Sequence, residues 1–136
     1  MMTNRYTSIP LTAVASDYPL STAQRRLWVL SQFEESNAAY NMPGVYVFTG
    51  DLNVNTLKKA FIGLIERHEI LRTVFKKNER EEVRQFILAL EAVGFNIAYQ
   101  DISKEPNQKE MLQDLVREVF TIPFQLEQGP LLRASV

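Results

Sequence analysis

The residues best able to carry chemistry lie together in Glu66-Arg67-His68-Glu69, with Arg72 close behind. His68 is the sole histidine of the chain, and an imidazole beside carboxylates can act as a general acid or base. It also falls on the apolar stripe of a periodic segment, where a core histidine with a satisfied ring nitrogen is the more common arrangement. Clusters of this kind are either functional sites or structural ion-pair networks, and the residues alone favour a network.

Other candidate chemistry is weaker. Ser21 would need a neighbouring base to act as a nucleophile, whereas Ser21-Thr22-Ala23-Gln24 fits a helix capping box. The five glycines never reach the spacing of a phosphate-binding loop. The charged run Glu79-Arg80-Glu81-Glu82 predicts a solvated turn between strands and gives no pattern of paired catalytic carboxylates. The residue types therefore leave general acid–base work to scattered carboxylates, Lys, Tyr and one His.

Composition narrows the class of protein further. The chain has 136 residues, the size of one small domain, and is 46% hydrophobic and 23% charged, which is enough apolar surface for a globular core. The net charge of -1 gives no footprint for nucleic acid or an anionic membrane. The absence of Cys excludes a disulfide scaffold, a thiolate metal site and a cysteine nucleophile, and one His excludes a His-rich zinc site. No signal peptide or membrane span is indicated, so we expect a cytoplasmic protein.

Periodicity and composition predict three helices and about five strands. The helices are expected over about 22–34, 54–68 and 106–120, with Ser21 and Asn53 as N-caps. The strands are expected over 45–49, 70–75, 83–88, 95–99 and 131–136, and a loop over 35–43. The alternating blocks predict an α/β class, an α+β sandwich with helices packed on a mixed sheet. Because the last strand runs to the final residue without a turn, we expect a truncated fragment.

Two segments resemble the core motifs of a known family. Ser21-Thr22-Ala23-Gln24-Arg25-Arg26-Leu27-Trp28-Val29-Leu30 resembles the first core motif, SxAQxR(L/M)(W/Y)xL, of the condensation domains of nonribosomal peptide synthetases. Arg67-His68-Glu69-Ile70-Leu71-Arg72-Thr73-Val74-Phe75 matches their second core motif, RHExLRTxF, at every defined position. Between them, residues 39–43 resemble an AYNxP stretch. Residues 124–133 resemble FDLxxGPLLR, with Gln125 in place of the usual Asp.

The resemblance implies part of the N-terminal lobe of a chloramphenicol acetyltransferase-like fold, over 18–136, with 1–17 as a lead-in or linker. It also implies an activity: an amide bond forms between a donor acyl or peptidyl thioester and an acceptor amino acid. Both substrates are tethered by phosphopantetheine to upstream and downstream peptidyl carrier domains, beside the adenylation domain of the same synthetase. No cofactor or metal is expected to bind this chain directly.

The family's active-site motif, HHxxxDG, is expected beyond Val136, so the resemblance assigns no catalytic residue to this chain and His68 does not replace it. It assigns structural support of the active site to the second core motif. The first-motif positions are Ser21, Ala23, Gln24, Arg26, Leu27, Trp28 and Leu30. The second-motif positions are Arg67, His68, Glu69, Leu71, Arg72, Thr73 and Phe75.

Two placements follow from this assignment. Arg67 and Arg72 flank a helix-to-strand turn, where a guanidinium can pair bidentately with a carboxylate from a neighbouring loop. Without that loop, we expect at least one of the two to be underpaired or turned to solvent. Arg26 and Trp28 are expected near the tunnel side of the lobe.

Two alternatives to a condensation domain stay open for the parent protein. The parent protein could be a non-catalytic lobe that only docks a carrier protein, or an epimerisation or acyltransferase relative of the same superfamily. Within the condensation family, the wording of the first motif and AYNxP resembles the subtype that accepts an L-configured donor. An uncovered sheet edge would also allow self-association of the chain. The fragment alone is expected to be inactive.

Overall fold

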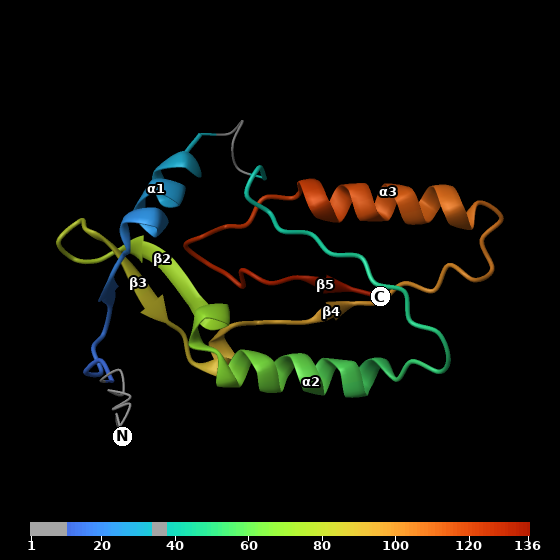
Figure 1. The fold of residues 1–136 in the computed structure, drawn as a ribbon, viewed down its shortest axis with the longest axis horizontal. Helices are drawn as coiled ribbons and strands as arrows, with labels where there is room; N and C mark the ends of the chain where they lie inside the picture. Colours follow the sequence, from blue (N-terminus) through green and yellow to red (C-terminus); the bar gives the residue numbers. More distant parts are fainter. Residues whose placement is uncertain (1–10, 34–37) are drawn as a thin grey trace, which may run out of the picture.

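The structure is a computed structural model that describes residues 11–33 and 38–136. Figure 1 shows β1, β2, β3 and α1 gathered at one end of the molecule, with α2 and α3 extending along the other. The elements follow the order β1 (Tyr18–Pro19), α1 (Thr22–Leu30), α2 (Val54–Arg67), the 3₁₀ helix η2 (Glu69–Arg72), β2 (Thr73–Lys77), β3 (Val83–Ile87), the 3₁₀ helix η3 (Leu90–Ala92), β4 (Ile97–Ala98), α3 (Gln108–Thr121) and β5 (Ala134–Ser135).

The five strands among the described residues are divided between two small sheets. One is antiparallel with the order β1-β3-β2, and its register pairs Phe75 with Gln85 and Tyr18 with the same Gln85 from the other side. The other consists of β4 and β5, which run parallel with Ile97 opposite Ala134. In Figure 1 this parallel pair runs between α2 and α3. The predicted class, helices combined with parallel and antiparallel strands, is confirmed.

The helices lie close to their predicted positions because their start signals are local. Asn53 caps α2 by accepting a hydrogen bond from the backbone N–H of Thr56 at 2.9 Å. α1 is shorter than predicted and ends at Leu30, since Ser31 caps it with its hydroxyl on the carbonyl of Trp28 at 2.7 Å. The predicted end of this helix and part of the predicted loop over 35–43 lie outside the described residues.

The strand predicted over 45–49 is wrong: these described residues are extended but belong to neither sheet. Val45, Tyr46, Val47 and Phe48 are exposed on both faces, by 62%, 81%, 88% and 63%. A β-branched and aromatic run favours a strand only where another strand supplies its hydrogen bonds. No described segment supplies them here.

The remaining strands are shorter or later than predicted. The strand expected from Ile70 begins at Thr73, because η2 takes up residues 69–72 and the Thr73 hydroxyl donates to the Glu69 carbonyl at 2.8 Å. The strands expected over 95–99 and 131–136 are reduced to the two-residue pair β4 and β5. Parallel pairing ends at Val136, whose N–H donates to the carbonyl of Ala98 at 2.8 Å.

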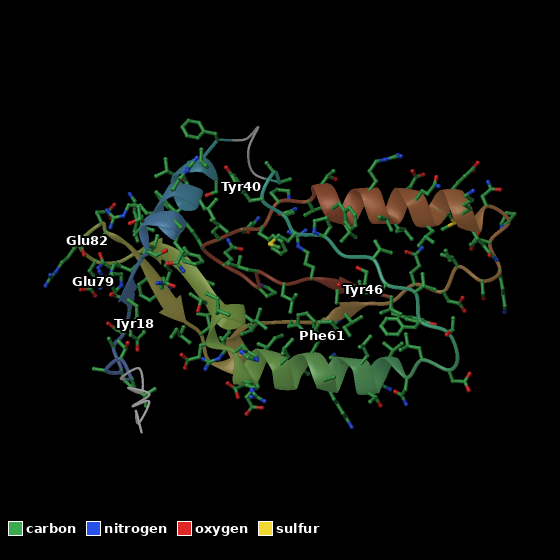
Figure 2. The ribbon with its side chains drawn as sticks, in the orientation of Figure 1. Tyr18, Tyr40, Tyr46, Phe61, Glu79 and Glu82 are labelled. Atoms are coloured by element: carbon green, nitrogen blue, oxygen red, sulfur yellow. The ribbon has the colours of Figure 1, made fainter. Side chains whose placement is uncertain are left out.

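The core lies where α2 meets β2 and the chain before β4. Ile65 and Val74 are fully buried, and Phe61 of α2 packs on Phe95 with the ring centroids 5.5 Å apart. Figure 2 places Phe61 on the side of α2 that faces β4. Gly129, at a φ of 65°, allows the chain to cross Val74 closely, since a Cβ there would lie 3.0 Å from its Cγ1. None of the helices in the described part of the chain is long and apolar enough to cross a membrane.

Candidate functional site

The second core motif forms the junction from α2 through η2 to β2. Arg72 holds this junction: its Nη1 donates to the carbonyl of Leu88 at 2.7 Å, and its Nη2 pairs with Glu69 Oε1 at 3.2 Å. The backbone N–H of Leu88 returns a hydrogen bond to the Arg72 carbonyl at 2.8 Å. Side chain and backbone therefore bind the start of β2 to the end of β3 at one point.

Arg67 and His68 behave differently from Arg72. Arg67 ends α2, is exposed, and forms no ion pair with any residue that the structure describes, as expected for at least one of the two arginines. His68 was expected in the core, and this is wrong because its side chain is exposed. The reason is geometric: α2 stops at Arg67, and the extended backbone of His68 (φ −113°, ψ 97°) no longer follows the helical periodicity of the apolar stripe.

The rest of the second motif joins the junction to the C-terminal segment. Thr73 is buried to 4% exposure and Phe75 to 9%, while Leu71 is half-buried. The N–H of Phe75 donates to the carbonyl of Leu126 at 2.8 Å. The second motif thus includes η2, and it contacts β3 and the loop that precedes Gly129. Its described side chains form no assembled acid–base pair.

The first core motif begins with the predicted capping box. The Ser21 hydroxyl accepts from the Gln24 N–H at 3.2 Å, and Gln24 Oε1 accepts from the Ser21 N–H at 2.8 Å. Gln24 has a second task that sequence reasoning missed, because its Nε2 donates to Gln85 Oε1 at 3.0 Å. Gln85 Nε2 in turn donates to the carbonyl of Pro19 at 2.8 Å. The cap therefore fixes α1 against β3 and β1, and Ser21 acts as a cap.

The remaining first-motif residues lie on α1 and differ in exposure. Ala23, Arg26 and Leu27 are exposed, and Trp28 and Leu30 are half-buried. The indole Nε1 of Trp28 is buried and meets no hydrogen-bond acceptor among the described residues. Arg26 is exposed, and the placement of Arg26 and Trp28 near a tunnel stays a prediction.

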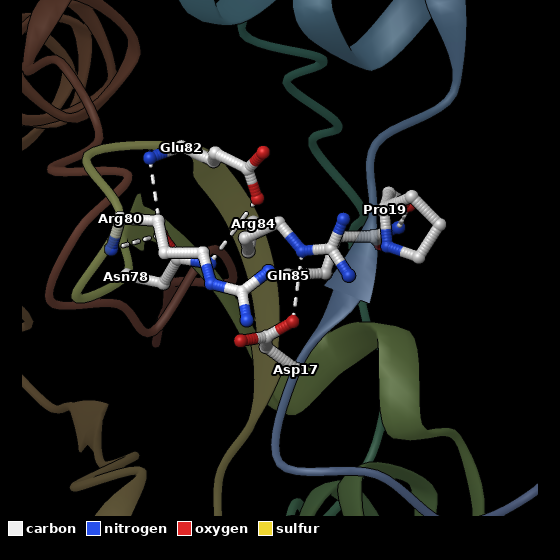
Figure 3. A network of polar contacts seen from close by, with 7 residues as sticks. All are labelled: Asp17, Pro19, Asn78, Arg80, Glu82, Arg84 and Gln85. Atoms are coloured by element: carbon white, nitrogen blue, oxygen red, sulfur yellow. Dashed lines mark hydrogen bonds and ion pairs between the residues drawn. The ribbon is translucent and has the colours of Figure 1, made fainter.

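A polar network joins the lead-in to the β2–β3 hairpin. Figure 3 shows Arg84 of β3 reaching Asp17, with Nε and Oδ1 2.8 Å apart and both side chains partly buried. In the hairpin turn, Asn78 Oδ1 accepts from the N–H groups of Arg80 at 2.9 Å and Glu82 at 3.0 Å. The carboxylate of Asp17 therefore anchors the end of the lead-in to the sheet.

Lys77 and Glu81 form an exposed ion pair across the same turn, with Nζ and Oε2 2.7 Å apart. The hydrogen bond and charge of Lys77 lower the pKa of Glu81, and those of Glu81 raise the pKa of Lys77. Both groups are exposed, so the pair shapes the hairpin tip and makes no catalytic arrangement.

Two further residues are brought together at the end of α3. Asn41 Nδ2 donates to the carbonyls of Phe120 and Ile122, and Arg133 donates to the carbonyls of Ile122 and Pro123. Asn41 lies in the AYNxP segment and Arg133 ends GPLLR, but neither was assigned a role from the sequence. Their signal was present as a donor side chain inside each recurring segment, and only the fold shows its target.

An open groove of about 580 Å³ lies beside α3, away from both core motifs. Its lining is largely apolar and consists of Val45, Leu112, Gln113, Val116, Arg117, Phe120 and Thr121. Among the residues that the structure describes, no group of three His, Asp or Glu side chains is placed to hold a metal ion. In the described part of the chain, the two motifs contain no complete reacting centre, and their support of an active site stays a prediction.

Comparison with known proteins identifies the family to which the chain belongs. The family model described as the condensation domain matches residues 14–136, which include both core motifs and the α3 end. The chain belongs to the condensation domain family, as the resemblance indicated.

Among curated proteins, the chain is 38% identical over 136 residues to bacitracin synthase 3 of Bacillus licheniformis, covering 100% of this chain and 2% of that protein. It is 35% identical over 134 residues to gramicidin S synthase 2 of Brevibacillus brevis, covering 98% of this chain and 3% of that protein. The chain thus spans a small part of the synthetases it matches.

Solved structures share the fold. The epimerization domain from the third module of tyrocidine synthetase B matches with a TM-score of 0.74 and 20% identity, over 90% of this chain and 27% of that chain. A variant of the starter condensation domain of rhizomide synthetase matches with a TM-score of 0.71 and 22% identity, over 89% of this chain and 29% of that chain. The arrangement of α1 to β5 is therefore that of one part of such a domain.

Proposed function

We propose that this chain is the N-terminal part of a condensation domain that forms amide bonds in a nonribosomal peptide synthetase. The observation that carries the proposal is the family match over 14–136, with SxAQxR and RHExLRTxF in order and folded as α1 and the α2–β2 junction. We assign the domain boundary as in the sequence prediction, with a lead-in over 1–17 and the domain from 18.

The proposed reaction joins two carrier-tethered substrates. The acceptor amine attacks the carbonyl carbon of the donor thioester, a C–N bond forms, and the C–S bond to the upstream phosphopantetheine breaks. The amine loses a proton and the leaving thiolate gains one, so the products are an amide on the downstream carrier and a free thiol upstream. No residue of this chain matches HHxxxDG, and the proposal places proton transfer in that motif of the parent domain.

In the proposal, residues of this chain position the active-site loop of the parent domain. Arg72 is already engaged by Leu88 and Glu69, whereas the guanidinium of Arg67 is exposed and available to a carboxylate from another part of the domain. A bidentate arginine–carboxylate pair fixes the orientation of a loop as well as its distance. Arg67 is accordingly the second-motif residue that would hold the aspartate of the active-site loop.

The partners in the proposal are carrier domains on either side of the parent domain and the adenylation domain of the same synthetase, in the cytoplasm. Phosphopantetheine enters as the arm of the substrates and is not a cofactor of this chain. The exposed run Val45–Phe48 would be covered in the parent domain, and in the isolated chain it offers an apolar surface for self-association.

The test uses the synthetase module that contains this chain, with donor and acceptor carriers loaded. Mass spectrometry of the downstream carrier should show the donor and acceptor masses joined, with free thiol upstream. An exchange of the donor α-hydrogen with solvent deuterium, without a joined product, would contradict condensation and indicate epimerisation. Carriers that bind the module but keep both groups would contradict it in favour of a docking lobe.

A further inference from the structure

The C-terminal end of α3 is held by side chains from two distant segments. The last carbonyls of a helix lack partners inside the helix and carry its negative dipole end, so they accept hydrogen bonds from donors elsewhere. Here the carbonyl of Phe120, in the last turn of α3, accepts from Asn41. The carbonyls of Ile122 and Pro123, which directly follow the helix, accept from Asn41 and Arg133. The carbonyl of Ile122 accepts from both.

Asn41 spans two of these carbonyls with one amide group. Its Nδ2 lies 2.9 Å from the oxygen of Phe120 and 3.0 Å from that of Ile122, which are 79 and 81 positions away in the chain. The contact ties the segment that follows α1 to the end of α3. An aspartate here would place a carboxylate against two carbonyls and repel them.

Arg133 makes the second half of the contact. Its Nη1 lies 2.9 Å from the Ile122 oxygen and its Nη2 2.6 Å from the Pro123 oxygen, while the guanidinium lies 3.9 Å from the centre of the Phe124 ring. No ion pair accounts for the position of Arg133, since no carboxylate of the described residues pairs with it. A planar fork that bridges two carbonyls and stacks on a ring is a geometry that lysine does not reproduce.

Arg133 lies directly before β5, so its contact with the end of α3 constrains where β5 lies. β5 begins at the next residue, Ala134, and pairs with β4 over two residues. Two backbone bonds extend the pairing, from Gln100 N–H to the Val136 carbonyl at 2.9 Å and from Val136 N–H to the Ala98 carbonyl at 2.8 Å. A ladder this short gives weak control over where β5 lies, so the side-chain contact with α3 adds a constraint on it.

We propose that Asn41 and Arg133 are positioning residues: Asn41 fixes the chain at the end of α3, and Arg133 holds β5 against that fixed end, which sets the place of the chain that β5 leads into. The inference rests on the proposed function, in which that following chain carries the active-site motif. Loss of the contact displaces reacting groups without altering surfaces where carriers dock. It therefore lowers the rate of the chemical step more than it raises the KM for a loaded carrier.

The test compares Arg133→Ala, Arg133→Lys, Asn41→Ala and Asn41→Asp in the complete synthetase module. The matched control is Arg117→Ala, because Arg117 lies on the same helix and is exposed with a single contact to Asp114. Single-turnover amide formation and the apparent KM for the loaded acceptor carrier are measured for each. Hydrogen exchange is followed at the amides of Gln100 and Val136, with the Phe75 amide as the reference.

We expect Arg133→Ala to slow the single turnover by about tenfold or more with a KM change of about twofold or less, since small misplacements of reacting groups have large effects on rate. Arg133→Lys should fall between it and the wild type, and Asn41→Asp should be slower than Asn41→Ala. Exchange should rise at Gln100 and Val136 and stay constant at Phe75, and Arg117→Ala should match the wild type.

A wild-type rate in Arg133→Ala and Asn41→Asp, or a loss carried entirely by KM, overturns the inference. Equal increases in exchange at Phe75, Gln100 and Val136 overturn it too, because they indicate general destabilisation. If Arg133→Ala fails to fold, Arg133→Lys and Asn41→Ala supply the same comparison. A wild-type module that forms no amide contradicts the proposed function instead, and the exchange pattern still decides whether the contact holds β5.

Discussion

At the scale of single residues, Arg67 and Arg72 share one motif but differ in what they contact. Arg72 satisfies the carbonyl of Leu88 and pairs with Glu69, so its charge stabilises the junction itself. Arg67 is exposed, without an ion pair in the described part of the chain. The first is a structural residue of this chain, and the second is available to a group from outside it.

This difference predicts opposite effects of two substitutions in the synthetase module. Arg72→Ala removes a charged donor from a partly buried carbonyl and should lower the free energy of unfolding by about 1.5–3 kcal/mol. Arg67→Ala should change it by about 0.5 kcal/mol or less, as for a surface position, yet reduce the condensation rate. Thermal melting and single-turnover rates give the two readouts.

Arg80→Ala is the matched control for Arg67→Ala, because Arg80 is also exposed and lies on the β2–β3 turn away from the junction. It should retain the wild-type rate. A full rate in Arg67→Ala, or a loss of stability equal to that of Arg72→Ala, would contradict the assignment of Arg67 to an outside carboxylate.

The Lys77–Glu81 pair predicts a local pH dependence. The hydrogen bond from Lys77 and then its charge lower the pKa of Glu81 below its ordinary value of 4.5. The contribution of the pair is therefore present above about pH 4.5 and lost as the pH falls through the lower folded pKa. NMR titration of the Glu81 carboxyl should give a pKa below the ordinary value of 4.5, and Lys77→Met should return it to the ordinary range; an unchanged pKa in that variant would contradict the pairing.

At the scale of elements, α1 owes its place to one glutamine that serves two partners. Gln24 Oε1 completes the capping box and its Nε2 reaches Gln85, which holds β1 through the Pro19 carbonyl. The first core motif is thus explained in this chain by how it starts a helix and attaches it to a sheet.

Substitutions at Gln24 separate these two tasks. Gln24→Glu keeps an acceptor for the Ser21 N–H but loses the donor to Gln85, whereas Gln24→Ala loses both. Ser21→Ala removes the cap alone and should cost about 1 kcal/mol of unfolding free energy. Denaturant unfolding should rank Gln24→Ala as the least stable, and equal stability of Gln24→Ala and Gln24→Glu would show that the Gln85 contact contributes nothing.

Local signals explain which elements the sequence predicts well. Each helix signal is local: Ser21 and Asn53 directly precede the helices they cap, and the periodic stripe around Ile65 lies within α2 itself. Whether 45–49 pairs as a strand depends on another segment that supplies hydrogen bonds, and this is not encoded locally. His68 was misplaced because the helix ends one residue earlier than its apolar periodicity suggests.

The residues of the site also separate into those set by local sequence and those set by long-range contacts. The capping role of Ser21 and an exposed guanidinium at one of Arg67 and Arg72 followed from residue type and position, and the structure shows that the exposed one is Arg67. The contacts of Gln24 with Gln85 and of Arg133 with Ile122 join parts of the chain that only the fold brings together. Sequence reasoning had marked the segments that hold Asn41 and Arg133 without a physical role for either.

At the scale of the whole molecule, two small sheets and three helices leave much apolar surface uncovered. Ile65 and Val74 are fully buried, while Met42 is 96% exposed and Val47 88% exposed. Large exposed apolar stretches indicate surfaces that pack against something else. This agrees with a chain that covers 27–29% of the solved domains sharing its fold. We therefore propose that these residues support a reaction carried out by a larger domain.

The most direct measurement of that account is single-turnover amide formation by the module and by residues 1–136 alone, with the same loaded carriers and with circular dichroism to establish that the chain is folded. The module should transfer the donor group to the acceptor amine, and the chain alone should give only the uncatalysed background. A module without product, or condensation by residues 1–136 above that background, would contradict it.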